Sequence, residues 1–523
     1  MMGRAMSMWG VLGGLLTACF LWLALPGGGE FWPILFLAML PLFTVTIIEN
    51  GRVRFFAGLA GGFFHFLMQM YWIVIVLRQY GGLSFALSVS GCAALALYLA
   101  LYFALFCYFA GLVVKKLHSG YVLFFFPCLW VGLDWARSFF LTGLPWLDLG
   151  YGLWSNPYLL QIADLLGHYG LSFLVIMINT AIFCLFLKDD RLVKFVCVTV
   201  TILMTGAAVG YGKWRRDMVT HEMRKMPTAV VGAVQGNIAQ GLKWSQDQQE
   251  KTVKTYLDST FALTIDGRQP DLVVWPETAL PFYPARSALF PQVVSFAKIN
   301  KVNIITGAPW FQIGDEKKAR VDYFNSAFVI SSLGGVGDIY FKTHLVPFGE
   351  YVPLKNFFSF LAPLVENVSD FSSGTMMEPL VAGKVKAGML ICFESIFPDI
   401  ARKSVRGGAN LLVNLTNDAW YGRSSAPYQS MAMSVVRAVE TRRSLVRAAN
   451  TGVSAFVDPL GEVRMSSDIF VKWAEKAILP LMEHTSFYME KGHYFPVVCL
   501  LVSLFIWGRA MMFPVRKRKH LLM

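Results

Sequence analysis

The stretch Ala387-Gly388-Met389-Leu390-Ile391-Cys392-Phe393-Glu394-Ser395 indicates the fold and the chemistry of the middle of this 523-residue chain. A short apolar run turns acidic directly after Cys392, which is typical of a buried strand in an α/β scaffold that presents a nucleophile at its end. The chain has eight cysteines, and the other seven lie in strongly apolar stretches. Cys392 is therefore a candidate nucleophile, and a buried structural cysteine is the alternative.

The composition is that of a polytopic membrane protein, with 55% hydrophobic and 15% charged residues and a mean hydropathy of +0.51. Apolar segments of about spanning length occur seven times before residue 212 and once after residue 490. They run over residues 8–25, 32–48, 55–77, 84–114, 121–135, 159–187, 195–210 and 494–513. We therefore expect eight transmembrane helices.

Lysine and arginine fall on alternate loops between these segments, as expected if the basic loops are cytoplasmic. This pattern predicts three parts: seven transmembrane helices in residues 1–212, an extracytoplasmic domain in residues 213–490, and an eighth helix with a basic tail in residues 491–523. Both termini are then cytoplasmic. The net charge of +13 follows largely from these loops, so we expect no binding of nucleic acid.

The extracytoplasmic part alternates short β-rich runs with polar or helical stretches, which is typical of an α/β fold. We expect helices over residues 245–263 and 429–442. The expected strands are residues 229–234, 272–275, 303–306, 326–330, 388–392, 411–415 and 454–457.

Several of these strands end in polar residues, at 235–237, 275–278, 392–394 and 414–418. In α/β folds the residues just past the carboxyl ends of strands converge on one crevice. The sequence thus predicts a site that combines a thiol, carboxylates and amides.

A cysteine nucleophile needs a base or a nearby cation. The histidines of this part are scattered and form no metal-binding pair, so we expect neither a metal nor another cofactor. Glu277, held after a strand by Pro276, could accept the thiol proton if burial raised its pKa. Lys342 could stabilise an anionic tetrahedral intermediate.

Trp275-Pro276-Glu277, Lys342 and Cys392 resemble the Glu-Lys-Cys triad of the nitrilase superfamily. Three longer motifs are similar to those of the bacterial apolipoprotein N-acyltransferases, a membrane-embedded branch of that superfamily. These motifs are Lys342-Thr343-His344-Leu345-Val346-Pro347-Phe348-Gly349-Glu350-Tyr351-Val352-Pro353, Asn417-Asp418-Ala419-Trp420-Tyr421-Gly422 and Gly143-Leu144-Pro145-Trp146-Leu147. The resemblance covers essentially the whole chain and implies a nitrilase-like αββα sandwich outside the membrane.

The resemblance also implies roles for individual residues. Glu277 would be the general base, Lys342 the oxyanion-stabilising residue and Cys392 the acyl-carrying nucleophile. Glu350 and Glu394 match supporting carboxylates, whereas Trp244, Trp420 and Phe393 match positions at the substrate entrance. The family commonly has Tyr where this chain has Phe393.

The implied reaction is the last step of lipoprotein maturation at the bacterial inner membrane. A monomer would take a fatty acyl chain from a phospholipid, phosphatidylethanolamine being the expected donor, and pass it to the N-terminal α-amine of a diacylated apolipoprotein. A membrane-tethered nitrilase-like amidase and a non-catalytic lipoprotein-binding scaffold are the alternatives. The apolar stretches 279–283 and 357–364 are candidates for lipid-facing lids or for core segments, and Trp244 and Trp420 for entrance or core residues.

Overall fold

The structure of the protein is a computed structural model that describes residues 2–48, 50–313, 321–351, 371–375 and 378–514. The chain forms two compact units. The first unit comprises Met1–Arg78, Leu83–Arg216 and Glu490–Met523, and the second comprises Gln79–Gly82 and Asp217–Met489. The stretch 357–364 and the basic residues 516–519 of the expected cytoplasmic tail lie outside the described residues.

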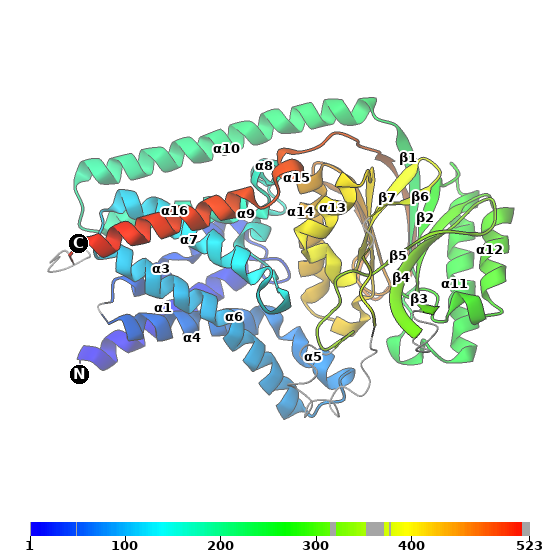
Figure 1. Ribbon diagram of the computed structural model, residues 1–523, viewed down its shortest axis with the longest axis horizontal. Coiled ribbons are helices and arrows are strands. Elements are labelled where there is room, and N and C mark those ends of the chain that lie inside the picture. Colours follow the sequence, from blue (N-terminus) through cyan, green and yellow to red (C-terminus); the bar gives the residue numbers. More distant parts are fainter. Residues whose placement is uncertain (1, 49, 314–320, 352–370, 376–377, 515–523) are drawn as a thin grey trace. The chain divides into compact units, whose positions relative to one another are not determined.

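The first unit is built from apolar helices (Figure 1). The longer ones are α1 (Met2–Ala24), α4 (Gly51–Met70), α6 (Phe85–Val114), α7 (Ser119–Arg137), α9 (His168–Phe186) and α16 (Tyr494–Met512). The shorter ones are α2 (Leu35–Ala38), α3 (Leu40–Thr46), α5 (Trp72–Gln79) and α8 (Ala163–Leu166). Helix α10 (Arg191–Lys225) begins in this unit and ends in the second.

Five of the described helices, α6, α7, α9, α10 and α16, are long and apolar enough to cross a membrane. Helices α4 and α5 meet the same test as a pair bent by 59°. The apolar helices Met8–Ala24 and Trp32–Thr46 are shorter. Several apolar helices therefore fit a membrane protein, whereas the count of eight spans stays a prediction.

Glycines allow α1 and α4 to pack with their backbones in contact. A Cβ added to Gly14 would lie 2.7 Å from the Cα of Gly61. Small residues at such crossings are typical of membrane helices, where close van der Waals packing drives association. Two charged residues of α7, Asp134 and Arg137, interrupt its apolar sequence, and both are buried. Arg137 lies 3.5 Å from Asp134 and also forms an ion pair with Asp148, which follows α7 in the chain.

The second unit contains two six-stranded sheets. The order in the first is β12 (Trp473–Pro480), β1 (Thr228–Gln235), β2 (Leu272–Val274), β3 (Asn303–Ile313), β4 (Val321–Ile330) and β5 (Val336–Phe341). The order in the second is β11 (Val463–Ser466), β10 (Ala455–Val457), β9 (Ser444–Ala449), β8 (Leu411–Thr416), β7 (Val385–Ile391) and β6 (Leu380–Ala382). Strands β1, β2 and β3 are parallel, as are β7, β8 and β9.

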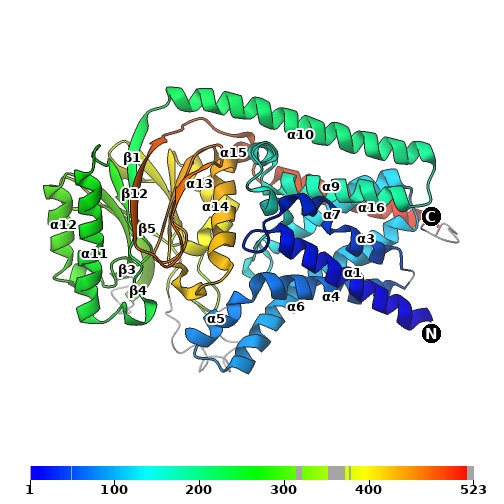
Figure 2. The ribbon, with the colours of Figure 1, turned by 180° about the vertical axis from the view of Figure 1, so that it is seen from behind.

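The sheets face each other across one apolar core, to which β1, β2 and β4 contribute from one side and β7, β8 and β9 from the other. Helices α11 (Gln246–Ile265) and α12 (Phe290–Ile299) cover the outer face of the first sheet, whereas α13 (Pro398–Arg406) and α14 (Ala426–Thr441) cover that of the second (Figures 1 and 2). The central strands are largely apolar because both of their faces are buried. This unit is therefore the αββα sandwich expected from the sequence.

All seven expected strands are present, at β1, β2, β3, β4, β7, β8 and β10. The expected helices 245–263 and 429–442 are α11 and α14. The stretch 279–283 belongs largely to the core, because Ala279, Leu280 and Phe282 are buried against α11 and α12. Of its two interpretations, the core one is correct.

Candidate functional site

Cys392 lies where β7 ends and a 3₁₀ turn, η9 (Cys392–Ile396), begins. Its backbone has a φ of 53°, in the left-handed region that non-glycine residues rarely adopt. Such conformations persist where the surroundings enforce them, and they are frequent at active sites. The residue is only 8% exposed, so the turn places a thiol at the edge of the core.

Glu277 and Lys342 come from the other sheet. Glu277 follows β2 through Trp275 and Pro276, and Lys342 directly follows β5. Both side chains are buried, and Lys342 Nζ lies 3.9 Å from Glu277 Oε1. The same ammonium donates a hydrogen bond of 2.9 Å to Glu350 Oε1, so one cation is shared between two carboxylates.

Asn325, near the middle of β4, connects the two carboxylates. Its Nδ2 donates to Glu277 Oε1 at 2.7 Å and to Glu350 Oε1 at 2.9 Å. The other oxygen, Glu277 Oε2, is buried and has no hydrogen-bond partner among the described residues. One oxygen of Glu277 is thus fixed and the other is free to accept a proton.

Burial governs the protonation of these groups. Burial raises the pKa of Glu277, against the effect of the Lys342 cation. Burial also raises the pKa of Cys392 to about 12; the carboxylate of Glu277 adds to the increase and Lys342 opposes it. Burial would lower the pKa of Lys342, but the carboxylates of Glu350 and Glu277 outweigh it and raise that pKa. At neutral pH the site therefore contains a protonated thiol and an ammonium.

Glu394, in the η9 turn, binds five donors. Its Oε2 accepts from the Ile391 N–H at 2.7 Å. Its Oε1 accepts from the N–H groups of Thr343 at 2.7 Å and His344 at 3.1 Å. The same oxygen accepts from the hydroxyls of Thr343 at 2.8 Å and Tyr340 at 2.9 Å. This carboxylate therefore ties the Cys392 turn to the segment around Lys342.

Glu350 has a similar anchoring arrangement. Besides the bonds from Lys342 and Asn325, its Oε2 accepts from the Val346 N–H at 2.8 Å. His344 is not a suitable base, because burial and the Lys342 cation lower the pKa of its imidazole to about 4. Among the described residues, no three His, Cys, Asp or Glu side chains are grouped so that they could hold a metal ion.

The aromatic residues expected at the entrance differ in exposure. Trp244 is 53% exposed and Trp420 is 37% exposed. Tyr80 packs its ring edge-on against Trp420, with centroids 4.7 Å apart, and its hydroxyl donates to the Ala419 carbonyl at 2.9 Å. Phe393 is buried and packs edge-on against Phe397.

Comparison with known proteins identifies the family. Residues 17–181 match the family model described as the apolipoprotein N-acyltransferase N-terminal domain, and residues 230–470 match the carbon-nitrogen hydrolase model. The apolipoprotein N-acyltransferase of Geobacter metallireducens is 39% identical over 498 residues, which cover 94% of this chain and 92% of that protein. The chain belongs to the apolipoprotein N-acyltransferase family.

A second apolipoprotein N-acyltransferase, from Shewanella oneidensis, is 32% identical over 88% of this chain and 88% of that protein. The crystal structure of a carbon-nitrogen hydrolase from Helicobacter pylori G27 is similar over 49% of this chain and 89% of that chain, with 17% identity and a TM-score of 0.36. The two N-acyltransferases confirm the family predicted from the sequence motifs.

In this member of the N-acyltransferase family, two polar residues of the site were not expected from the sequence. They are Asn325, which donates to Glu277, and Arg447, which donates to Asp418. Thr416 ends β8 in the polar run 414–418 that was expected at the site, and its hydroxyl lowers the pKa of the Cys392 thiol. Asn325 and Arg447 lie inside strands, where their residue type gives no signal of function.

Proposed function

We propose that this protein transfers a fatty acyl chain from a membrane phospholipid to the N-terminal α-amine of the diacylglyceryl-cysteine of apolipoproteins. The proposal combines membership in the N-acyltransferase family with the grouping of Glu277, Lys342 and Cys392. The observation that carries it is the free Glu277 Oε2, a buried acceptor in a site whose thiol is protonated. A general base is what such a nucleophile requires.

In the first half-reaction, the Cys392 sulfur attacks the ester carbonyl of the phospholipid. Glu277 Oε2 accepts the thiol proton as the carbon–sulfur bond forms, and the Lys342 ammonium stabilises the oxyanion. When the tetrahedral intermediate collapses, the carbon–oxygen bond breaks and Glu277 returns the proton to the departing alkoxide. The products are a lysophospholipid and an acyl thioester on Cys392.

In the second half-reaction, the neutral α-amine of the acceptor attacks the thioester. Glu277 accepts a proton from the attacking nitrogen and gives it to the departing Cys392 thiolate, so the amide forms and the thiol is regenerated. An amide is more stable than a thioester, so this half-reaction runs downhill. Lys342 stabilises the oxyanion again, so one set of residues serves both halves.

We further propose eight spans, in an inner membrane, with both termini in the cytoplasm and residues 213–490 in the periplasm. The alternation of basic loops supports this topology. Both substrates are lipid-anchored, which gives a physical reason for fixing the catalytic unit to a bilayer. Phosphatidylethanolamine as donor and a monomeric state are part of the same proposal. A periplasmic reporter fused near residue 300 should be active, and a reporter active only in the cytoplasm contradicts this topology.

The direct test is transfer by the purified full-length protein in vesicles that contain phospholipid and a diacylated lipopeptide. We expect a triacylated peptide and an equal amount of lysophospholipid. Cys392→Ala should abolish both products, whereas Cys19→Ala, at an exposed cysteine of the first unit, should retain them. Free fatty acid without triacylated peptide would indicate an amidase-like hydrolase instead. Full transfer by Cys392→Ala would refute the proposed nucleophile.

A further inference from the structure

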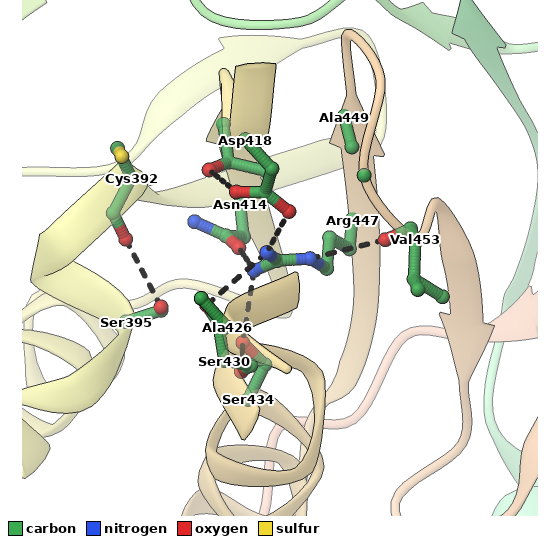
Figure 3. Close-up of polar contacts among 12 residues, drawn as sticks. Cys392, Ser395, Asn414, Asp418, Ala426, Ser430, Ser434, Arg447, Ala449 and Val453 are labelled. Atoms are coloured by element: carbon green, nitrogen blue, oxygen red, sulfur yellow. Dashed lines mark hydrogen bonds and ion pairs between the residues drawn. The ribbon is translucent and has the colours of Figure 1, made fainter. Parts of the chain in front are cut away.

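Arg447, on β9, is a fully buried cation next to the site. The proposed chemistry assigns it no role. Its guanidinium extends between strand β8, helix α14 and the loop after β9 (Figure 3). It donates to Asn414 Oδ1, to Asp418 Oδ2 at 2.9 Å, to Ser430 Oγ at 3.1 Å, to Ser434 Oγ at 3.3 Å and to the Val453 carbonyl at 3.1 Å.

Asp418 is the single carboxylate that this guanidinium neutralises among the described residues. It is buried, and its second oxygen, Oδ1, accepts from the Thr416 hydroxyl at 2.8 Å. Thr416 lies beside Cys392, because each residue directly follows the parallel pair Leu415 and Ile391 of β8 and β7, and the Thr416 hydroxyl lowers the pKa of the Cys392 thiol. Arg447, Asp418 and Thr416 therefore form a continuous hydrogen-bonded chain that ends beside Cys392.

The backbone of Gly452 lies directly against the carboxylate of Asp418. A Cβ added to Gly452 would lie 1.9 Å from Asp418 Oδ2, so only glycine fits at that position. The ion pair is nearly inaccessible to water, and removal of one partner would leave the other charge buried and unpaired. A lysine could supply the charge, but its ammonium lacks the planar fork by which Arg447 reaches several acceptors.

The charges around the thiol show why neutralising Asp418 matters. The titratable groups that act on Cys392 are Glu277 after β2, Lys342 after β5 and Asp418 after β8. Asp418 raises the pKa of the thiol, which opposes formation of the thiolate. At the neighbouring Tyr421, also close to the thiol, Asp418 raises the phenol's pKa and Arg447 lowers it. The two charges thus act in opposite directions on the same surroundings.

We propose that Arg447 is a positioning residue for acyl transfer, which neutralises Asp418 and holds Thr416 against the Cys392 thiol so that this thiol can give its proton to Glu277. The inference deepens the proposed function and rests on it for the role of Cys392. Arg447 itself touches neither substrate nor sulfur; it acts through Asp418 and Thr416.

The test measures how fast Cys392 reacts with iodoacetamide in the full-length protein in vesicles, followed by mass spectrometry of the peptide that contains Cys392. The pKa of the thiol lies far above pH 8, so the rate at that pH changes about tenfold for each unit by which this pKa shifts. Four proteins are compared with the unaltered chain: Arg447→Met, Asp418→Asn, the double variant, and Arg406→Met on the exposed surface of α13 as a matched control.

We expect Arg447→Met to react about tenfold more slowly and Asp418→Asn about tenfold faster, because a buried unpaired charge shifts a neighbouring pKa by about one unit or more. The double variant should return to within about threefold of the unaltered chain, as should Arg406→Met. A purely structural role would move both single variants in the same direction. Equal rates in all proteins, or a double variant as slow as Arg447→Met, would overturn the proposal.

If Arg447→Met does not fold, as judged by its thermal unfolding, Asp418→Asn decides: faster alkylation in the folded protein supports the proposal and an unchanged or slower rate overturns it. Alkylation needs neither phospholipid nor acceptor. If the proposed function is wrong, the unaltered chain should not transfer an acyl group, although the variants still differ in alkylation rate. If the inference is wrong, the unaltered chain should transfer normally, and the variants should not differ in alkylation rate.

Discussion

Replacement of Glu394 by glutamine tests whether this carboxylate serves as scaffold or takes part in the chemistry. Glu394 accepts five hydrogen bonds from Ile391, Tyr340, Thr343 and His344, and it is fully buried. None of these bonds reaches Cys392, Lys342 or Glu277. Glutamine keeps the shape and one carbonyl oxygen but loses the charge. We therefore expect the Glu394→Gln variant to lose mainly stability.

The size of the effect follows from the bonds. Four of the five donors can still bind the amide oxygen of the glutamine. Each of these hydrogen bonds loses about 1 kcal/mol, because a hydrogen bond to a charged group is stronger than one to a neutral group. The amide NH₂ then faces the Ile391 N–H, which costs about another 1–3 kcal/mol for an unsatisfied buried donor. Burial raises the pKa of Glu394, so burying a neutral amide instead of a charge offsets part of this loss. We expect a net loss of about 2–3 kcal/mol, equivalent to a fall in Tm of roughly 3–6 °C for a unit of this size.

The assay combines thermal unfolding of the purified protein with acyl transfer measured well below the transition. Glu250→Gln, on the exposed surface of α11, is the matched control and should alter neither quantity. We expect Glu394→Gln to retain transfer within about tenfold once folded, since the loss concerns the anchoring of the turn. A variant with unchanged Tm and no transfer would refute the scaffold role and assign a chemical step to Glu394.

Three further changes act on the chemistry itself. Cys392→Ser should lower turnover on the order of 10³-fold or more, because an alkoxide is harder to form than a thiolate; near-normal transfer would contradict the nucleophile assignment. Lys342→Met should lower kcat by about 10²–10³-fold through loss of oxyanion stabilisation, and an effect on KM alone would argue against that role. Asn325→Ala removes a hydrogen bond that lowers the pKa of Glu277, so the acidic limb of the pH–rate profile, where Glu277 becomes protonated, should move to higher pH. A limb that moves to lower pH in steady-state kinetics would exclude Glu277 as the base.

Much of the site could be predicted from the sequence because its residues follow strands. Glu277, Lys342 and Cys392 come directly after, or within three residues of, β2, β5 and β7, and two of these strands are short apolar runs that the sequence displays. Their convergence follows from the rule that strand ends of an α/β fold meet at one edge. The long motifs around Lys342 and Trp420 then indicated the family.

The parts that could not be predicted lie where tertiary contacts override local pattern. Strand β9 (Ser444–Ala449) contains Arg447, which interrupts the apolar run and whose partners Asp418 and Asn414 are distant in sequence. Asn325 lies one residue before the expected strand 326–330, because β4 extends further to pair with β3. Strand β12 lies at the edge of its sheet and is mostly only partly buried, and Glu475 and Lys476 interrupt its apolar residues.

The solvent exposure of the three aromatic residues expected at the entrance also depends on tertiary packing, which the sequence does not show. Phe393 was expected at the substrate entrance, but its side chain is buried against Phe397 and His344. The packing of Phe393 involves its ring alone and requires no hydroxyl. Trp244 and Trp420 stay partly exposed, so a role at the entrance remains a proposal for them.

The central claim, that Cys392 carries the acyl group, is tested most directly by intact mass spectrometry of the full-length protein incubated with phospholipid and no acceptor. We predict an added mass of one fatty acyl chain that maps to Cys392, is released by hydroxylamine, and disappears when a diacylated lipopeptide is supplied. Transfer that proceeds with no such adduct, or with an adduct on another residue, would contradict the account.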